Sequence, residues 1–392
     1  MFPERFSNLP AYAFPRLRAL LDHHPAGGDT VHMTIGEPKH PFPAWVGEEL
    51  TAHLAGFNKY PPNDGSEQLL SAISGWLKRR FNITVASDTQ ILALNGTREG
   101  LYNACMALVP ETVSGERPNI LMPNPFYQVY AVAAASVGAR SVFANATRAT
   151  GFLPDFAGLP TDILKKTAAA FICSPSNPQG AVASQAYLRE LIALAEEFDF
   201  QIFSDECYSE IYRNDPPPSA LAVAAQMGAH PERVVIFHSL SKRSNLPGLR
   251  SGFVAGGPES IRRLKQLRNY AGAPLPTPLQ AVAARAWSDE AHVVQNRALY
   301  QEKYKIADDI MADFEGYKGP EGGFFLWLPV EDGETAALRL WRETGVRVLP
   351  GAYLSRDTEG RNPGKTYIRV AMVAPKEEMQ QGLIRLKSCL QS

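Results

Sequence analysis

The chain has 392 residues, and its 39 Lys and Arg residues nearly balance its 40 Asp and Glu residues, which gives a formal net charge of −1. Hydrophobic residues make up 45% of the sequence, which argues against intrinsic disorder, and the balanced charge argues against an electrostatic interface with nucleic acid. No run of about 18 apolar residues predicts a membrane span, and the four scattered cysteines predict neither a disulfide framework nor a zinc site. We therefore expect a cytoplasmic enzyme of two domains, with no metal, nucleic-acid or membrane partner.

Short apolar segments in the middle of the sequence are predicted strands. Most are continuous apolar runs, which is typical of strands buried on both faces of a sheet. Helical patterns separate several of them; residues 66–81, for example, place Leu69, Ile73 and Leu77 on one helix face. Strand–helix–strand units at this spacing predict an α/β fold with a mostly parallel, seven-stranded sheet covered by helices. The predicted strands are residues 90–94, 119–122, 140–143, 168–173, 200–204, 233–237 and 251–255.

The two ends of the chain have a different pattern. Residues 1–45 are rich in proline and turn signals. Beyond Pro278 comes a long helical stretch over 280–314, which we expect to be broken, and then EGGFFLWLPV, a helix around 335–344 and YIRVAMV. This order predicts a smaller α+β domain built from both ends, residues 1–45 and 285–392, beside a large domain of residues 46–284.

The strongest chemical signal is Ser239-Leu240-Ser241-Lys242, followed by Gly248-Leu249-Arg250, directly after a predicted strand. Hydroxyls and a guanidinium suit a phosphate group, because hydroxyls donate hydrogen bonds and arginine binds oxyanions with two N–H groups. A partly desolvated lysine beside such a site can act as a Schiff-base nucleophile. The alternative is that Lys242 and Arg250 are ordinary surface cations.

Three other motifs also follow predicted strands, where ligands bind in open α/β sheets. Asp205 and Tyr208 lie in SDECY; the carboxylate can pair with a pyridine nitrogen, or it can simply cap a helix. Asn177 lies in SPSNPQG, which is otherwise a turn, and NGTRE, around Thr97, presents backbone N–H groups to an anion. Together the motifs predict a phosphate site, a carboxylate, a phenol, an amide and a lysine at successive strand ends.

In this order, and over essentially the whole chain, the motifs resemble the fold-type I, pyridoxal-phosphate-dependent aminotransferases of class I/II. The resemblance implies that Lys242 forms the Schiff base with pyridoxal 5'-phosphate and later moves the substrate proton. It implies that Asp205 pairs with the pyridine nitrogen and that Tyr208 and Asn177 bind the 3'-oxygen. It also implies a phosphate site of backbone groups and side chains, made of Gly96, Thr97, Arg98, Ser239, Ser241 and Arg250.

The same resemblance implies the remaining roles. Tyr127, in NPFY, stacks on the cofactor ring, and Tyr60, in KYPPNDG, reaches the phosphate of the neighbouring subunit of a homodimer. Arg369, in YIRVAMV, binds the substrate α-carboxylate, with Asn177 and the backbone of Gly36 beside it. The expected partners are small-molecule substrates, namely amino acids and keto acids.

The sequence motifs NGTREGL, NPFYQVY and FHSLSKRSNLPGLRSGF most resemble those of the bacterial N-succinyldiaminopimelate aminotransferases of lysine biosynthesis. This implies amino transfer between L-glutamate and N-succinyl-2-amino-6-oxopimelate, with Lys39, Arg98 and Arg243 as candidate cations for the distal carboxylates. Three alternatives stay open: an aspartate- or acetylornithine-type aminotransferase, a C–S lyase with the same cofactor, and a non-catalytic regulator. Regulators of this kind carry a DNA-binding domain before the aminotransferase part, whereas IGEP already stands at residues 35–38. Phe325, Trp327 and Cys207 are expected to serve packing.

Overall fold

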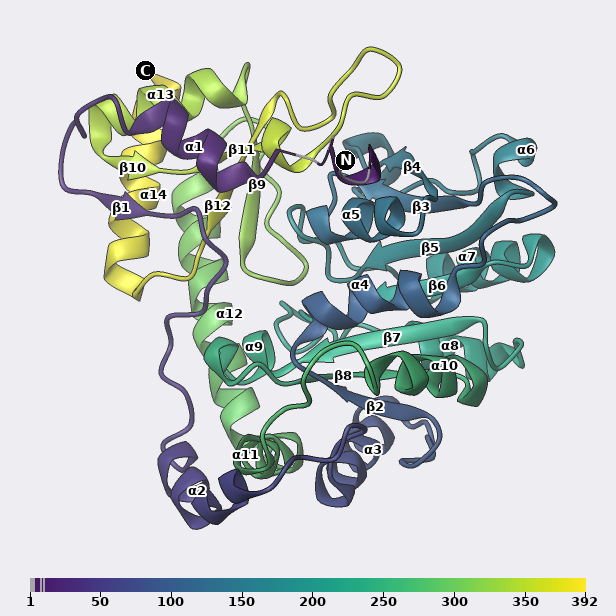
Figure 1. The fold of residues 1–392 in the computed structure, drawn as a ribbon. Helices are drawn as coiled ribbons and strands as arrows, with labels where there is room; N and C mark the ends of the chain where they lie inside the picture. Colours follow the sequence, from purple (N-terminus) through teal and green to yellow (C-terminus); the bar gives the residue numbers. More distant parts are fainter. Residues whose placement is uncertain (1–3, 8, 10) are drawn as a thin grey trace.

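A seven-stranded sheet forms the centre of the larger part of the molecule (Figure 1). The computed structural model describes residues 4–7, 9 and 11–392. The strand order is β2-β8-β7-β6-β5-β3-β4. Strand β8 runs in the opposite direction to the other six. All seven predicted strands are therefore confirmed, as is the mostly parallel sheet. The strands are β2 (Ile91–Leu94), β3 (Asn119–Asn124), β4 (Arg140–Asn145), β5 (Thr167–Cys173), β6 (Gln201–Asp205), β7 (Val234–Ser239) and β8 (Gly252–Ala255).

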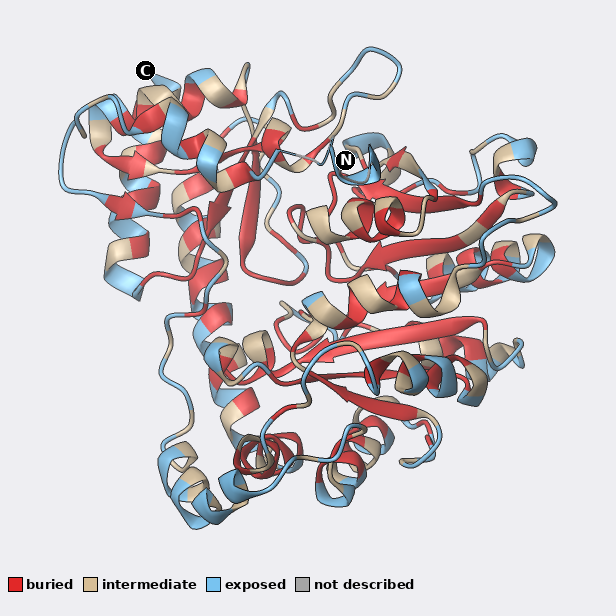
Figure 2. Ribbon diagram, in the orientation of Figure 1, coloured by how far each residue is buried: buried red, intermediate tan, exposed pale blue. Residues whose placement is uncertain are grey.

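Helices cover both faces of this sheet, so nearly every residue of its central strands is buried (Figure 2). One face packs against α3 (Glu67–Phe81), α7 (Gln185–Phe198), α8 (Ala220–Met227) and α11 (Thr277–Ser288). The other packs against α4 (Thr97–Leu108), α5 (Gln128–Ser136) and α10 (Pro258–Arg268). The predicted face of α3 is buried as expected, and the helix begins where the Ser66 side chain accepts a hydrogen bond from Leu69 N.

The chain ends form a second, smaller unit with its own core. Its three-stranded antiparallel sheet has the order β11-β12-β9, and a two-stranded parallel sheet pairs β1 with β10. The expected break in the long helical stretch falls at Asp289 and Glu290, between α11 and α12. Figure 1 shows α12 running from beside α11 to the helices of the smaller unit. These elements are α1 (Ala13–Leu21), β1 (Val31–His32), α12 (Ala291–Met311), β9 (Phe325–Pro329), α13 (Gly333–Thr344), β10 (Val346–Arg347), β11 (Leu349–Pro350), β12 (Tyr367–Ala371) and α14 (Lys376–Gln391).

Short helices complete the chain. They are η1 (Glu4–Phe6), α2 (Val46–Ala52), η2 (Leu54–Asn58), η3 (Arg148–Thr150), α6 (Thr161–Leu164), α9 (Leu240–Arg243), η4 (Pro247–Leu249) and η5 (Gly351–Leu354). Among the described residues no helix combines the length and the apolar character that a membrane crossing requires.

Candidate active site

A cavity of about 380 Å³ opens where the strands of the large sheet end. Because all strands but β8 point the same way, the residues that follow β2, β3, β5, β6 and β7 meet at one edge. The smaller unit closes the other side with Phe325 and Arg369. The cavity thus brings together twelve of the fourteen residues predicted from the sequence, all but Gly96 and Tyr60: Gly36, Thr97, Arg98, Tyr127, Asn177, Asp205, Tyr208, Ser239, Ser241, Lys242, Arg250 and Arg369.

Lys242 lies on the one-turn helix α9, which Ser239 caps by accepting a hydrogen bond from Ser241 N. Its Nζ donates to the carbonyl oxygen of Gly36. Burial lowers the pKa of Lys242 to about 8, and the cations Arg369 and Arg250 act in the same direction. A substantial fraction of this amine is therefore neutral near pH 7.5, which is what a nucleophile or proton acceptor requires.

Asp205 ends β6 with its carboxylate in the cavity, and it has a partner that the sequence motifs did not identify. The Tyr130 hydroxyl donates to Asp205 Oδ2 over 2.8 Å, while Cys207 N donates to Oδ1 over 3.3 Å. Burial raises the pKa of Asp205, and the hydrogen bonds from Cys207 and Tyr130 oppose that rise. Tyr130 lies in the first turn of α5, three residues after its N-cap residue Tyr127, and this spacing was the only local signal, because the contact with Asp205 spans 75 positions in sequence.

One end of the cavity is built for an anion. Thr97 begins the twelve-residue helix α4, so free backbone N–H groups face the cavity there. The hydroxyls of Ser239 and Ser241 lie 2.9 Å apart, and Arg250 Nη2 donates to Asn95 O over 3.2 Å. Gly96 has φ +82°, and a Cβ there would lie 2.2 Å from Arg250 Nη2. The missing side chain of Gly96 is thus what lets the guanidinium approach this turn.

The opposite end holds a buried cation. Arg369 donates from Nη1 to Asn177 Oδ1 over 3.0 Å and from Nη2 to Thr34 O over 2.7 Å, and its guanidinium lies 4.2 Å from the centre of the Phe325 ring. Its buried Nε has no hydrogen-bond partner among the described residues. Burial lowers the pKa of Arg369 to about 10, so the group stays charged at neutral pH. Phe325 belongs to the core, as predicted, but it also lines the cavity.

Only one of the three candidate cations for distal carboxylates lines the cavity. Arg98 does so, and its Nε donates to the Tyr127 hydroxyl over 2.9 Å. Arg243 is buried elsewhere, against the carbonyl of Ala286 and the carboxylate of Glu290. Lys39 is exposed outside the cavity wall. The sequence spacing could not separate these three, because all of them stand close to site motifs.

Two further predictions concern residues at the margins. The Tyr60 side chain is fully exposed and lies outside the cavity wall of this chain. Cys207 lines the cavity, and its Sγ lies 3.1 Å from the Thr97 hydroxyl. Burial raises the pKa of the Cys207 thiol well above its ordinary value, which opposes a nucleophilic role and agrees with packing.

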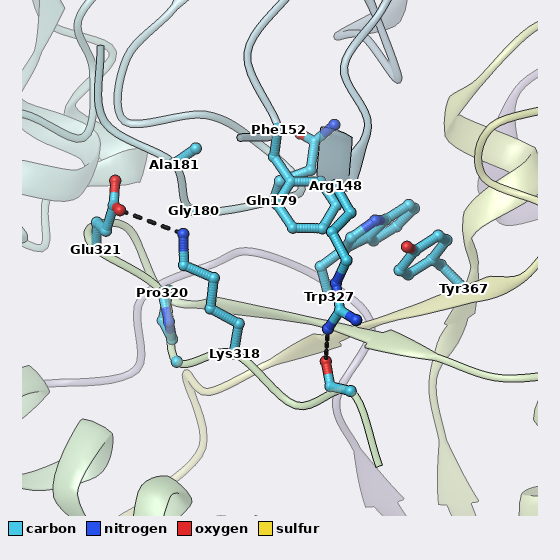
Figure 3. A pocket seen from close by; sticks show the side chains of 12 residues that line it. Arg148, Phe152, Gln179, Gly180, Ala181, Lys318, Pro320, Glu321, Trp327 and Tyr367 are labelled. Atoms are coloured by element: carbon cyan, nitrogen blue, oxygen red, sulfur yellow. Dashed lines mark hydrogen bonds and ion pairs between the residues drawn. The ribbon is translucent and has the colours of Figure 1, made fainter. Parts of the chain in front are cut away.

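A second, much smaller pocket lies behind the loop that carries Asn177 (Figure 3). Figure 3 shows the stacked rings of Trp327 and Tyr367 on one side and Gln179 on another. Its free space is about 10 Å³, close to the minimum for one water molecule. Hydrogen bonds close it, including Arg148 Nη2 to Gly316 O over 2.7 Å. This pocket is a packing seam between the two units and has no room for a substrate.

The side chains of the large cavity fit a phosphorylated pyridine aldehyde. An anion site of N–H groups, hydroxyls and Arg250 suits the phosphate, the buried Asp205 carboxylate suits a protonated ring nitrogen, and Lys242 suits the aldehyde carbon. The family model described as aminotransferase class I and II matches residues 29–386. The chain therefore belongs to the class I and II aminotransferases, and its cofactor is pyridoxal 5'-phosphate.

Curated relatives and solved structures that are similar to this chain are also aminotransferases. An LL-diaminopimelate aminotransferase from Dehalococcoides mccartyi is 30% identical over 98% of this chain and 97% of its own length. The 4-dedimethylamino-4-oxo-anhydrotetracycline transaminase OxyQ from Streptomyces rimosus is 31% identical over 93% of this chain and 94% of its own. Among solved structures, an aminotransferase from Neisseria meningitidis is 39% identical, with a TM-score of 0.94 over 99% of this chain and 100% of that one. Aminotransferase AspB from Helicobacter pylori is 34% identical, with a TM-score of 0.91 over 98% and 100%.

Proposed function

We propose that the protein transfers an amino group between L-glutamate and N-succinyl-2-amino-6-oxopimelate, a step of lysine and diaminopimelate biosynthesis. The observation that supports a substrate with a second carboxylate is Arg98, the one candidate cation of the three that lines the cavity, in addition to Arg369. The similarity to LL-diaminopimelate aminotransferases supports a diaminopimelate skeleton.

In this proposal Arg369 binds the substrate α-carboxylate through its free Nε, and Asn177 keeps the guanidinium in place. When bound, the pyridoxal ring withdraws the electron pair that remains after Cα loses its proton. Asp205, held by Tyr130, keeps the ring nitrogen protonated, and Tyr208 and Asn177 bind the ring oxygen. The free Nζ of Lys242 accepts the proton from Cα, and its fixed position replaces a bimolecular encounter.

The remaining predicted roles belong to the same proposal. Gly96, Thr97, Ser239, Ser241 and Arg250 hold the phosphate, together with the backbone of Arg98. Tyr127 stacks on the ring. Residues 46–284 act as the cofactor-binding domain, and residues 1–45 and 285–392, of which 1–3, 8 and 10 lie outside the described residues, act as the substrate clamp.

We also propose a homodimer in which Tyr60 reaches the phosphate of the neighbouring site. Tyr60 lies close in sequence to two exposed apolar side chains, Leu54 (49% exposed) and Phe57 (56%), and exposed apolar groups of this kind support a protein contact. Sedimentation at several concentrations measures the assembly, and Tyr60→Phe should weaken cofactor binding only if the hydroxyl reaches a phosphate.

A second candidate substrate is LL-diaminopimelate without the succinyl group. Glu37 also lines the cavity, and its carboxylate would attract the free ammonium that this substrate keeps and the succinylated one lacks. The names of the Dehalococcoides relatives favour the same candidate.

The deciding experiment is a panel of half-reactions. The enzyme is first converted to its amino form with glutamate and then mixed with N-succinyl-2-amino-6-oxopimelate, unacylated 2-amino-6-oxopimelate, oxaloacetate and N-acetylglutamate semialdehyde, while cofactor absorbance is recorded. The proposal requires that the absorbance of the aldehyde form returns fastest with the succinylated compound. If it returns fastest with oxaloacetate, the enzyme is instead an aspartate-type aminotransferase. Pyruvate release from cystathionine would identify a lyase.

Lys242→Ala should abolish turnover, and full turnover in that variant would contradict the mechanism.

Arg98→Gln tests the distal contact separately. The variant removes the charge but keeps the backbone amide, so its loss of kcat/KM should be at least about tenfold for dicarboxylic substrates, because a charged hydrogen bond contributes about 1.5–3 kcal/mol. Alanine, which has no distal carboxylate, is the matched control and should lose much less. Equal losses of kcat/KM for both kinds of substrate would show that Arg98 does not bind the distal carboxylate.

A further inference from the structure

Asn296, on α12, occupies a buried position directly behind the lysine turn. The residue is 5% exposed and does not line the cavity. Its Nδ2 donates to Lys242 O over 3.2 Å and to Arg243 O over 3.5 Å. Its Oδ1 lies 3.0 Å from Asn245 Nδ2 and 3.1 Å from His40 Nδ1. All four hydrogen-bonding positions of this amide are thus used.

The two donated bonds meet a specific need of the lysine turn. Helix α9 has only four residues, Leu240–Arg243, so the carbonyls at its end have no following turn of helix to bond to. Asn296 supplies donors to two of these carbonyls from a different helix. Because α12 belongs to the core of the smaller unit through Tyr300 and Tyr304, the turn is fixed against a rigid element.

The two accepted bonds reach the segment that holds the other end of Lys242. Gly36 O accepts from Lys242 Nζ, and four residues later His40 contacts Asn296 Oδ1. Burial and the nearby Lys303 lower the pKa of His40, so the ring is neutral at pH 7 and donates from Nδ1 to the amide oxygen. Pro38 and Pro41 stiffen this short segment, and Asn245 Nδ2 also lies 3.3 Å from Pro41 O.

These contacts form a closed ring: Lys242 Nζ to Gly36, along the chain to His40, across to Asn296, and back to Lys242 O. We propose that Asn296 is a positioning residue that fixes the main chain of Lys242 and the Gly36–Pro41 segment relative to each other, and so aims Nζ at the cofactor. The proposal rests on the proposed role of Lys242 as the cofactor lysine.

Asn296→Asp tests this with little change of shape, since it replaces the two N–H donors by an oxygen that faces two carbonyls. Gln295→Glu, on the exposed neighbour in the same helix, adds the same charge and is the matched control. Three quantities are measured: the rate at which the apoenzyme captures pyridoxal phosphate in stopped flow, the visible circular dichroism of the bound cofactor, and kcat with KM for glutamate. Thermal melting reports folding.

For Asn296→Asp we expect capture and kcat to fall about tenfold, which converts to about 1.4 kcal/mol, with KM within twofold and a weaker visible dichroism. Gln295→Glu should match the wild type in all three. A folded Asn296→Asp with unchanged capture rate and dichroism overturns the proposal, and so does an equal effect of Gln295→Glu.

Should Asn296→Asp not fold, His40→Phe removes one of the four bonds and keeps a ring against Tyr300, whose centre lies 4.5 Å from that of His40. It should slow capture about threefold, and an unchanged rate in the folded variant contradicts the proposal. Borohydride reduction of the wild-type holoenzyme, followed by peptide mass analysis, shows separately whether the cofactor is attached to Lys242. A failure of the proposed function is therefore seen before any Asn296 variant is made.

Discussion

Replacing Lys242 by methionine should stabilise the apoenzyme at neutral pH while ending catalysis. The charged amine is held in a place that opposes its charge: burial and the cations Arg369 and Arg250 lower its pKa from the ordinary 10.5 to about 8. A lysine whose pKa is lower in the folded than in the unfolded chain costs stability wherever it is protonated. Methionine has a similar length without the charge, so the variant removes this cost.

The size of the cost follows from the two pKa values. The fall from 10.5 to about 8, at about 1.4 kcal/mol per pH unit, corresponds to about 3 kcal/mol, which is an upper limit because the side chain is only partly shielded from water. Well below pH 8 the lysine is charged in both states and the full cost applies. Between pH 8 and 10.5 the unfolded chain binds more protons, so wild-type stability rises with pH, and above 10.5 the cost is gone.

The assay is urea unfolding of both apoenzymes from pH 7 to pH 11, read as the difference in the free energy of unfolding. Other titrating groups are common to both proteins and cancel in this difference. Lys242→Met should be the more stable by up to about 3 kcal/mol at pH 7, and this pH-dependent part should vanish by pH 11. Lys305→Met, at an exposed position, is the control and should show a flat difference. A flat difference for Lys242→Met as well would refute the lowered pKa.

Two further predictions concern the ends of the cofactor site. Tyr130→Phe removes the 2.8 Å bond to the buried Asp205 carboxylate, and such bonds contribute about 1.5–3 kcal/mol, so cofactor affinity measured by equilibrium titration should fall at least about tenfold; unchanged affinity would mean that the hydroxyl does not support the carboxylate. Gly96→Ala places a Cβ 2.2 Å from Arg250 Nη2 at a φ of +82°, so we expect the apoenzyme to lose affinity for inorganic phosphate as well as for the cofactor. Isothermal titration with both ligands measures this, and retained phosphate binding would exclude Arg250 from the anion site.

The central sheet could be predicted from the sequence because its signal is local. A strand buried on both faces must be apolar at successive positions, and β5 (Thr167–Cys173) shows this in the six consecutive residues after Thr167. The motifs could be placed in one site for the same reason: residues such as Asp205 and Ser239 end parallel strands, and parallel strands end at one edge. The smaller unit gave weaker signals, since β1 and β10 have two residues each and exist through pairing with one another.

Contacts between distant segments could not be predicted. Asp205 and Tyr130 are 75 positions apart, and Asn296 meets Lys242 from 54 positions away. In each case a polar residue in an ordinary helix has its role set by the strand or helix that it contacts, and no local pattern records that partner. For the same reason the sequence could not show which of Arg98 and Arg243 lines the cavity. Only packing decides which guanidinium faces the cavity and which is buried against Glu290.

In the proposed function, the charge of the cavity lets a nearly neutral chain bind anions. Its wall holds four basic side chains, Arg98, Lys242, Arg250 and Arg369, against two acidic ones, Glu37 and Asp205, although the whole chain has a net charge of −1. Desolvated cations without counter-ions are unfavourable, as the lowered pKa values of Lys242 and Arg369 record. In the proposed function, a phosphate beside Arg250 and a substrate carboxylate at Arg369 bring negative charge into this cavity and reduce the cost of burying its cations. The lowered pKa of Lys242 and the proposed anion sites are therefore two consequences of the same basic side chains in the cavity wall.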